Sequence, residues 1–83
     1  MSISETLVVN REWAEDLHRY CIDALRGKKF RTYPGNMLRH AYGVRDCMKR
    51  SKFYDLAQDI TREIGIFCEV NKEELAQARM KKR

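Results

Sequence analysis

Histidine and cysteine are the side chains of this sequence best suited to chemistry, and only two of them lie close together. His18 and Cys21 are three residues apart, a spacing that places both on one face of a helix. A zinc site needs several thiolates or imidazoles that converge, and the sequence has no Cys-x-x-Cys pair to help form one. We therefore interpret Cys21 as a small buried hydrophobic residue and His18 as partly solvated, and we expect no metal and no other cofactor.

A catalytic site would need a nucleophile beside a base, or two carboxylates in different environments. His40 and Cys47 are seven residues apart, which is about two helical turns, and such a pair is more typical of a polar helix face than of a catalytic dyad. Neither a Gly-x-Gly-x-x-Gly nor a Walker sequence occurs, so nothing indicates nucleotide binding. The sequence predicts a protein that is not an enzyme and that binds another macromolecule.

The cysteine pattern also bears on the compartment. Cys21, Cys47 and Cys68 are odd in number and widely spaced, unlike the dense, even cysteines of a disulfide-stapled secreted domain. The first residues contain no basic region followed by an apolar run, and no apolar stretch approaches the roughly 18 residues of a membrane span. We expect reduced thiols, a cytoplasmic location and no membrane contact.

The elements that must position these residues follow helical spacing. Asn10, or Ser2 with Glu5 three residues later, is a candidate cap for a first helix. Its apolar stripe runs through Trp13, Leu17, Tyr20 with Cys21, and Ala24 with Leu25. Gly27 is a typical residue at the end of a helix.

A second helix follows the turn residues Pro34-Gly35, with Asn36 as its expected cap. Its stripe comprises Met37, Ala41, Val44 and Met48, and Gly43 inside it indicates either a close approach of another helix or a bend. The longest stripe runs from Phe53 to Phe67 and makes the best core candidate. Residues 50–52 either end the second helix before the next stripe or continue it into that stripe. Asn71 with Glu74 predicts a last short helix.

The fold class that we predict is all-α, as an antiparallel helical hairpin or a small bundle. Residues 1–83 form a single domain, in which residues 70–83 are a short or frayed terminal helix. The main alternative to a purely helical chain is a short β pair, because Ile64–Val70 and Thr6–Val9 are rich in residues that favour strands. One hairpin cannot cover both of its own stripes, so we also expect a homodimer.

Charge is distributed in blocks along the chain. Residues 1–25 carry a net charge of −3, residues 26–52 of +8, residues 53–70 of −3 and residues 71–83 of +3. Such blocks predict that acidic and basic segments face each other, within a hairpin or across a dimer.

The basic block also contains aromatic residues, a mixture that is typical of binding surfaces. We predict a protein partner that contacts Lys28, Lys29, Phe30, Arg31, Tyr33, Arg39, Tyr42, Arg45 and Lys49. The alternative is a DNA- or RNA-binding regulator that uses Lys28, Lys29, Arg31, Arg39, Arg45 and Lys49, in agreement with an isoelectric point near 9.3. The acidic residues of the first and third stripes argue against nucleic acid.

The overall plan resembles a known group of proteins. In size, helical pattern, mixed charge and lack of a catalytic motif, and in the run from Met37 to Phe67, the chain resembles small helical proteins that phages encode to disable host regulators. Quorum-sensing anti-activators and pilus-motor inhibitors are examples. The resemblance carries no diagnostic motif and no residue role. It implies a stoichiometric inhibitor that sequesters a host transcription factor or an ATPase.

Overall fold

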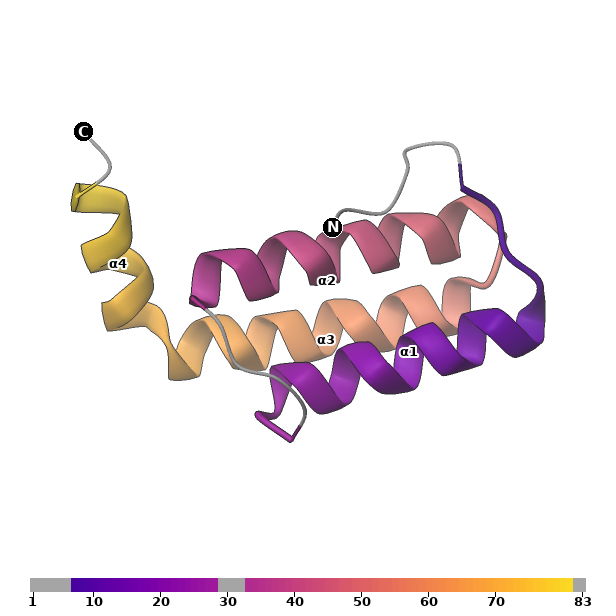
Figure 1. The fold of residues 1–83 in the computed structure, drawn as a ribbon, viewed down its shortest axis with the longest axis horizontal. Helices are drawn as coiled ribbons and strands as arrows, with labels where there is room; N and C mark the ends of the chain where they lie inside the picture. The colour runs from indigo at the N-terminus through magenta and orange to yellow at the C-terminus, as the bar shows by residue number, and fades with distance from the viewer. Residues whose placement is uncertain (1–6, 29–32, 82–83) are drawn as a thin grey trace.

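Three helices pack side by side and a fourth leaves the end of the third at a steep angle (Figure 1). The structure is a computed structural model that describes residues 7–28 and 33–81. The helices are α1 (Arg11–Leu25), α2 (Pro34–Arg50), α3 (Tyr54–Val70) and α4 (Lys72–Lys81). The all-α prediction and the short terminal helix are therefore confirmed, and the hairpin-or-bundle alternative is decided in favour of a bundle.

The ends of α1 follow from local sequence. The Asn10 side chain accepts a hydrogen bond from the Trp13 backbone N–H at 2.8 Å, which selects Asn10 as the cap; Ser2 and Glu5 lie outside the described residues. At the other end Gly27 has a φ of +78°. Its N–H donates to the Ala24 carbonyl, and the Lys28 N–H donates to the Asp23 carbonyl at 2.8 Å. This is a Schellman motif, in which glycine takes the left-handed position at no steric cost.

The start of α2 corrects the expected cap at Asn36. Tyr33 is the capping residue, and its carbonyl accepts hydrogen bonds from the N–H groups of Asn36 and Met37. Pro34 is the first helical residue, a position where its missing N–H costs nothing and its fixed φ favours the helix. Asn36 therefore lies inside the first turn.

The helix is interrupted between α2 and α3, a point that the sequence left open. Lys52 has a φ of +67°, the Phe53 N–H donates to the Met48 carbonyl at 2.8 Å, and the Lys52 N–H donates to the Lys49 carbonyl at 3.0 Å. The same Schellman arrangement that ends α1 thus ends α2, but with lysine in place of glycine. This turn separates α2 from α3 and lets both helices pack in the bundle.

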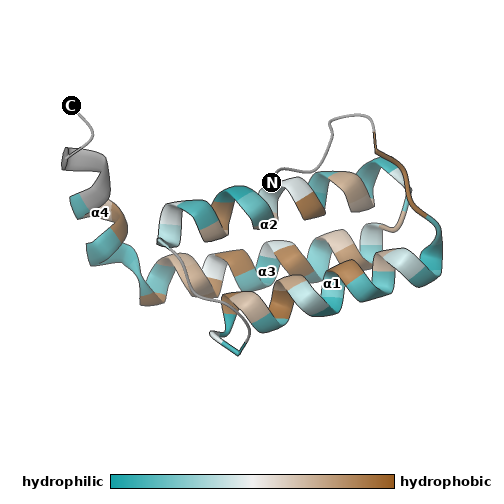
Figure 2. Cartoon of the chain, viewed as in Figure 1, coloured by the Kyte–Doolittle hydropathy of each residue, from teal (hydrophilic) through white to brown (hydrophobic). Residues whose placement is uncertain are grey.

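The core lies along the axis between α1, α2 and α3. Apolar residues concentrate on their facing sides (Figure 2). Met48, Ile60 and Val44 are its largest fully buried side chains. The buried apolar residues are Val9, Ala14, Cys21, Ile22, Ala24, Leu25, Met37, Ala41, Val44, Cys47, Met48, Leu56, Ala57, Ile60 and Ile64. Because α3 covers much of the stripes of α1 and α2, burial of these stripes does not require a second copy of the chain.

The first stripe is rotated from its expected position. Trp13 and Tyr20 are 49% and 44% exposed, whereas Ala14 and Ile22 are buried. Because α1 packs against both α2 and α3, it buries the arc of its surface that faces these two helices. Trp13 and Tyr20 lie at the edge of that arc and are therefore partly exposed to solvent. The structure shows no strand in residues 7–28 and 33–81, and Ile64–Val70 lie within α3. Thr6 of the expected strand pair lies outside the described residues.

Charge pairing follows the expected blocks only in part. Arg26 pairs with Glu63 at 2.7 Å, which joins the basic segment 26–52 to the acidic segment 53–70 as predicted. Arg11 pairs with Asp55 at 2.8 Å, and His18 Nε2 lies 2.6 Å from Asp59. These two contacts link α1 to α3, although segments 1–25 and 53–70 both carry net negative charge. Within the described residues, no helix has the length and apolar character needed to cross a membrane.

Candidate partner-binding surface

One side of α2, outside its buried stripe, carries four of the nine predicted contact residues. Arg39, Tyr42, Arg45 and Lys49 follow one another at spacings of three, three and four, and lie opposite the buried stripe that begins at Met37. We call these four residues the α2 strip. Tyr42 is 39% exposed, and Arg39 and Lys49 are exposed. The sequence therefore placed four of its nine predicted contact residues on one continuous surface.

The centre of the α2 strip is preorganised by contacts among neighbours. The Arg45 guanidinium lies over the Tyr42 ring, 4.9 Å from its centroid. Its Nε and Nη2 donate to Asp46 Oδ1 at 3.1 and 3.0 Å. The cation–π contact and the ion pair hold a long side chain against the helix, so less conformational entropy remains to be lost on binding. A tyrosine and an arginine in fixed positions are typical anchors of protein interfaces.

The helices differ in sign of charge. α2 contains four cationic side chains and one acidic one, for a net charge of +3 with histidine neutral, whereas α1 carries −2 and α3 carries −3. The positive field is therefore concentrated on the surface of α2, where it would steer an acidic partner toward the α2 strip.

The remaining predicted contacts belong to the connection before α2. Lys28 is exposed and Tyr33 is 78% exposed, so both are accessible where the connection leaves α1 and enters α2. Lys29, Phe30 and Arg31 lie outside the described residues. Tyr33 precedes Lys49 by sixteen residues, about 24 Å along a helix. The described members of the predicted set thus extend along α2 from Tyr33 at its start to Lys49 near its end.

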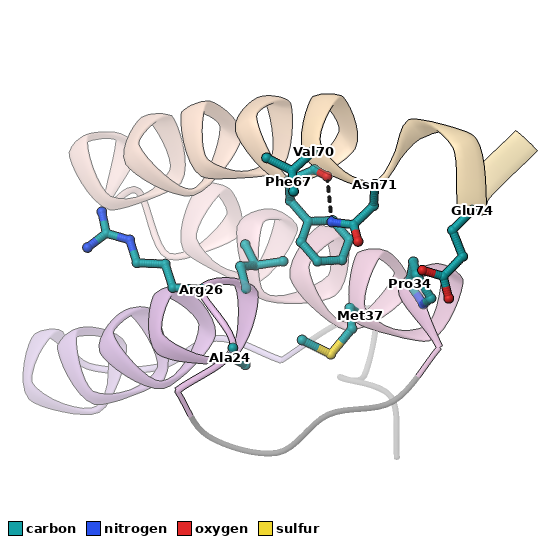
Figure 3. A pocket seen from close by; sticks show the side chains of 10 residues that line it. Ala24, Arg26, Pro34, Met37, Phe67, Val70, Asn71 and Glu74 are labelled. Atoms are coloured by element: carbon teal, nitrogen blue, oxygen red, sulfur yellow. Dashed lines mark hydrogen bonds between the residues drawn. The ribbon is translucent and has the colours of Figure 1, made fainter.

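A pocket of about 210 Å³ lies at that same end of the bundle, and sequence reasoning missed it. Figure 3 shows it between the end of α1, the start of α2, the end of α3 and α4. It is lined by Ala24, Leu25, Arg26, Gly27, Pro34, Met37, Phe67, Val70, Asn71 and Glu74. Small-molecule sites usually measure about 300–1,000 Å³, so this pocket suits an inserted side chain better than a cofactor. No local signal could reveal it, because four separate chain segments converge there.

Polar groups around the pocket are already engaged. Arg26 holds Glu63, whose side chain is only 7% exposed, through hydrogen bonds of 2.7 and 3.2 Å. The Asn71 amide donates to the Phe67 carbonyl at 2.9 Å, which closes the end of α3 (Figure 3). These contacts stabilise the junction of α1 and α3. The pocket lining is about equally polar and apolar, and Glu74 of α4 contributes a carboxylate to it.

The histidine and cysteine singled out first are separated by the fold. His18 turns toward Asp59 in a shallow groove between α1 and α3, and Cys21 is buried in the core. Burial raises the pKa of Cys21 to about 12, with a smaller contribution from Glu63, so its thiol stays protonated and unreactive at neutral pH. Across the described part of the chain, no three His, Cys, Asp or Glu residues are placed to hold a metal ion.

The chain was compared with protein-family models, with curated proteins and with solved structures, and none of the three comparisons found a match. The case for function therefore depends on the surface described above.

Proposed function

We propose that the protein is a small, non-catalytic regulator that binds an acidic surface of a partner protein through the α2 strip and modulates or inhibits that partner. The observation that carries this proposal is the Arg45–Tyr42 stack, flanked by exposed Arg39 and Lys49 on one helical face. Lys28 and Tyr33 extend the contact toward the pocket. A transcription regulator or an ATPase is the class of partner that the resemblance to phage-encoded inhibitors implies.

The α2 strip favours a protein over a nucleic acid because of Asp46. This carboxylate is half exposed and lies between Arg45 and Lys49 on the same helix, where it accepts both hydrogen bonds from Arg45. A phosphate backbone would meet a like charge there and would have to compete for Arg45. A protein surface can present a carboxylate to Arg39 or Lys49 and an apolar group to Tyr42, which matches the mixed character of the strip.

Binding should be tested with variants that reverse charge on the α2 strip. The tagged protein is used to capture partners from an extract of its source cells, and each captured protein is then purified and titrated by calorimetry. We expect Arg39→Glu with Lys49→Glu to weaken the interaction at least tenfold. Lys72→Glu is the matched control, because Lys72 is 71% exposed on α4 and outside the strip. Equal affinity of the strip variant and the control would contradict the proposed surface.

Nucleic-acid binding, the second candidate function, is favoured by the net charge of +3 on α2 and by Lys28 beside it. A duplex DNA and a single-stranded RNA should be titrated across 50–300 mM salt. Binding through three phosphate contacts would give a slope near −3 in a plot of log affinity against log salt for the duplex. Salt-sensitive binding that the double variant abolishes would support this second function, and no binding at about 50 mM salt would remove it.

A further inference from the structure

An aromatic seam runs along the boundary between α1 and α2, apart from the α2 strip. Trp13, Leu17 and Tyr20 follow one another at spacings of four and three, so they share one side of α1. The Tyr20 ring meets the His40 ring of α2 edge-on, with centroids 6.3 Å apart, which shows that this side of α1 borders α2. Trp13 and Tyr20 are 49% and 44% exposed, and Leu17 and His40 are partly buried. We call these four residues the seam.

The two sides of the seam carry opposite charge. On α1 its solvent side is bordered by Glu12, Asp16 and Asp23, one helical row away from Trp13 and Tyr20. On α2 it is bordered by the exposed Arg39. Gly43 follows His40 by three residues and is partly exposed, so this part of α2 presents little side-chain bulk to an approaching helix. Arg19, which pairs with Asp16, also lies on the α1 edge, and Asp46, which pairs with Arg45, follows Arg39 by seven residues on α2. Near Tyr20 and His40 the face thus has an acidic edge at Asp23, an apolar centre and a basic edge at Arg39.

We propose that a second copy of this chain covers the seam, with a two-fold axis parallel to the helices. When two identical faces meet about such an axis, α1 of each copy lies on α2 of the other, and the acidic edge meets the basic edge. An in-plane axis perpendicular to the helices would instead place α1 on α1 and bring like charges together. Charge complementarity therefore selects the first arrangement, which is the self-matching geometry of an isologous dimer.

A two-fold axis parallel to the helices keeps each residue at the same position along the helix direction in both copies. Charged residues that meet across the dimer must therefore lie at similar positions along that direction, and Asp23 and Arg39 do. The contact of Tyr20 with His40 gives a common level on the antiparallel α1 and α2. Asp23 lies three residues beyond that level and Arg39 one residue beyond it in the same direction. At 1.5 Å per residue they differ in height by about 3 Å, within reach of an arginine side chain.

The available area is that of a modest interface. α1 has 15 residues and is therefore about 22 Å long, and two adjacent helices are about 20 Å wide. The flat face measures at most roughly 450 Å² per copy, or about 900 Å² for the pair, because Leu7 already covers α2 at Cys47 and Arg50. This area falls in the range of weak, transient interfaces. We therefore expect a dimer that dissociates at micromolar concentrations. The dimer face shares Arg39 with the α2 strip and leaves Tyr42, Arg45 and Lys49 outside the contact.

Sedimentation equilibrium of the full chain between about 1 and 200 µM tests the proposal. We expect the mass to rise from one copy to two, and Trp13→Gln to weaken dimerisation at least tenfold. Tyr54→Gln is the matched control, since Tyr54 is 62% exposed on α3 and off the seam. Circular dichroism shows whether each variant keeps its helices, and a variant that does not is replaced by Leu17→Gln. A mass of one copy throughout the concentration range would overturn the proposal. Equal dimerisation of Trp13→Gln and Tyr54→Gln would also overturn it.

A charge exchange tests the axis separately. Asp23→Lys and Arg39→Glu should each weaken the dimer several-fold, and the two changes together should restore it, because the pair then meets with its signs reversed. If the double variant dimerises no better than the weaker single variant, α1 does not lie on α2 of the second copy and the proposed arrangement is wrong. These measurements report the mass of the isolated chain, so they are separate from partner binding. Lys49→Glu, which changes the α2 strip but lies outside the seam, should leave the mass unchanged.

Discussion

Replacing Lys52 with glycine should stabilise the protein. Lys52 is the one non-glycine residue with positive φ among residues 7–28 and 33–81, and it occupies the left-handed position that ends α2. The left-handed conformation costs a residue with a Cβ about 1–2 kcal/mol, and glycine avoids that cost. Glycine gives back about 0.5–1 kcal/mol because its unfolded chain has more freedom. We expect a net gain of roughly 0.5–1 kcal/mol in the free energy of unfolding.

Urea denaturation followed by circular dichroism, at one protein concentration, measures this change. Lys52→Ala is the control, because it removes the lysine side chain but keeps the strained conformation, so it should leave stability almost unchanged. For a chain of this size a gain of 1 kcal/mol corresponds to about 4–8 °C in Tm. If α2 and α3 formed one continuous helix, glycine would instead cost about 1 kcal/mol. Destabilisation by Lys52→Gly would therefore refute the turn between α2 and α3.

Three further predictions concern the core, the thiols and an exposed ion pair. Ile60→Ala should lower the free energy of unfolding by about 2–5 kcal/mol in urea titrations, because Ile60 is fully buried, whereas Ile66→Ala, at a site 53% exposed, should cost less than about 1 kcal/mol. Only the partly exposed Cys68 should react quickly with a disulfide reagent in the native state, since the other two thiols are buried and the pKa of Cys21 is raised to about 12 by burial; rapid labelling of Cys21 would contradict this. Hydrogen bonds from the Arg11 guanidinium lower the pKa of Asp55 to about 2, so this pair contributes stability above pH 4 that is lost as the pH falls toward 2; the stability of Asp55→Asn should lack this part of the pH dependence.

Several features were predictable because their causes lie within a few residues of the chain. A side-chain acceptor at Asn10 and a glycine at Gly27 mark helix ends through hydrogen bonds that span one turn. The stripe that begins at Met37 buries the residues that its spacing indicated, and the stripe from Phe53 to Phe67 buries its central residues but leaves Phe53 and Phe67 partly exposed. The α2 strip was predictable for the same reason, since residues three or four apart on one helix share a face whatever surrounds it.

The break at Lys52 and the rotation of α1 were decided only by tertiary structure. Lysine is a good helix former, and its left-handed conformation is tolerated because folding back lets α3 bury Ile60 and Leu56 against α1 and α2. The same packing decides which arc of α1 is buried, and so turns Trp13 outward.

The sequence by itself determined that this protein is helical, where its first helix ends, and that one basic, aromatic face lies on α2, because each of these depends on neighbours within about one helical turn. Tertiary structure alone decided that three helices share the core, that Arg26 reaches Glu63, and that four chain segments enclose a pocket. The physical reason is that burial and long-range ion pairing are properties of segments brought together by folding, and a local pattern does not specify which segments will meet.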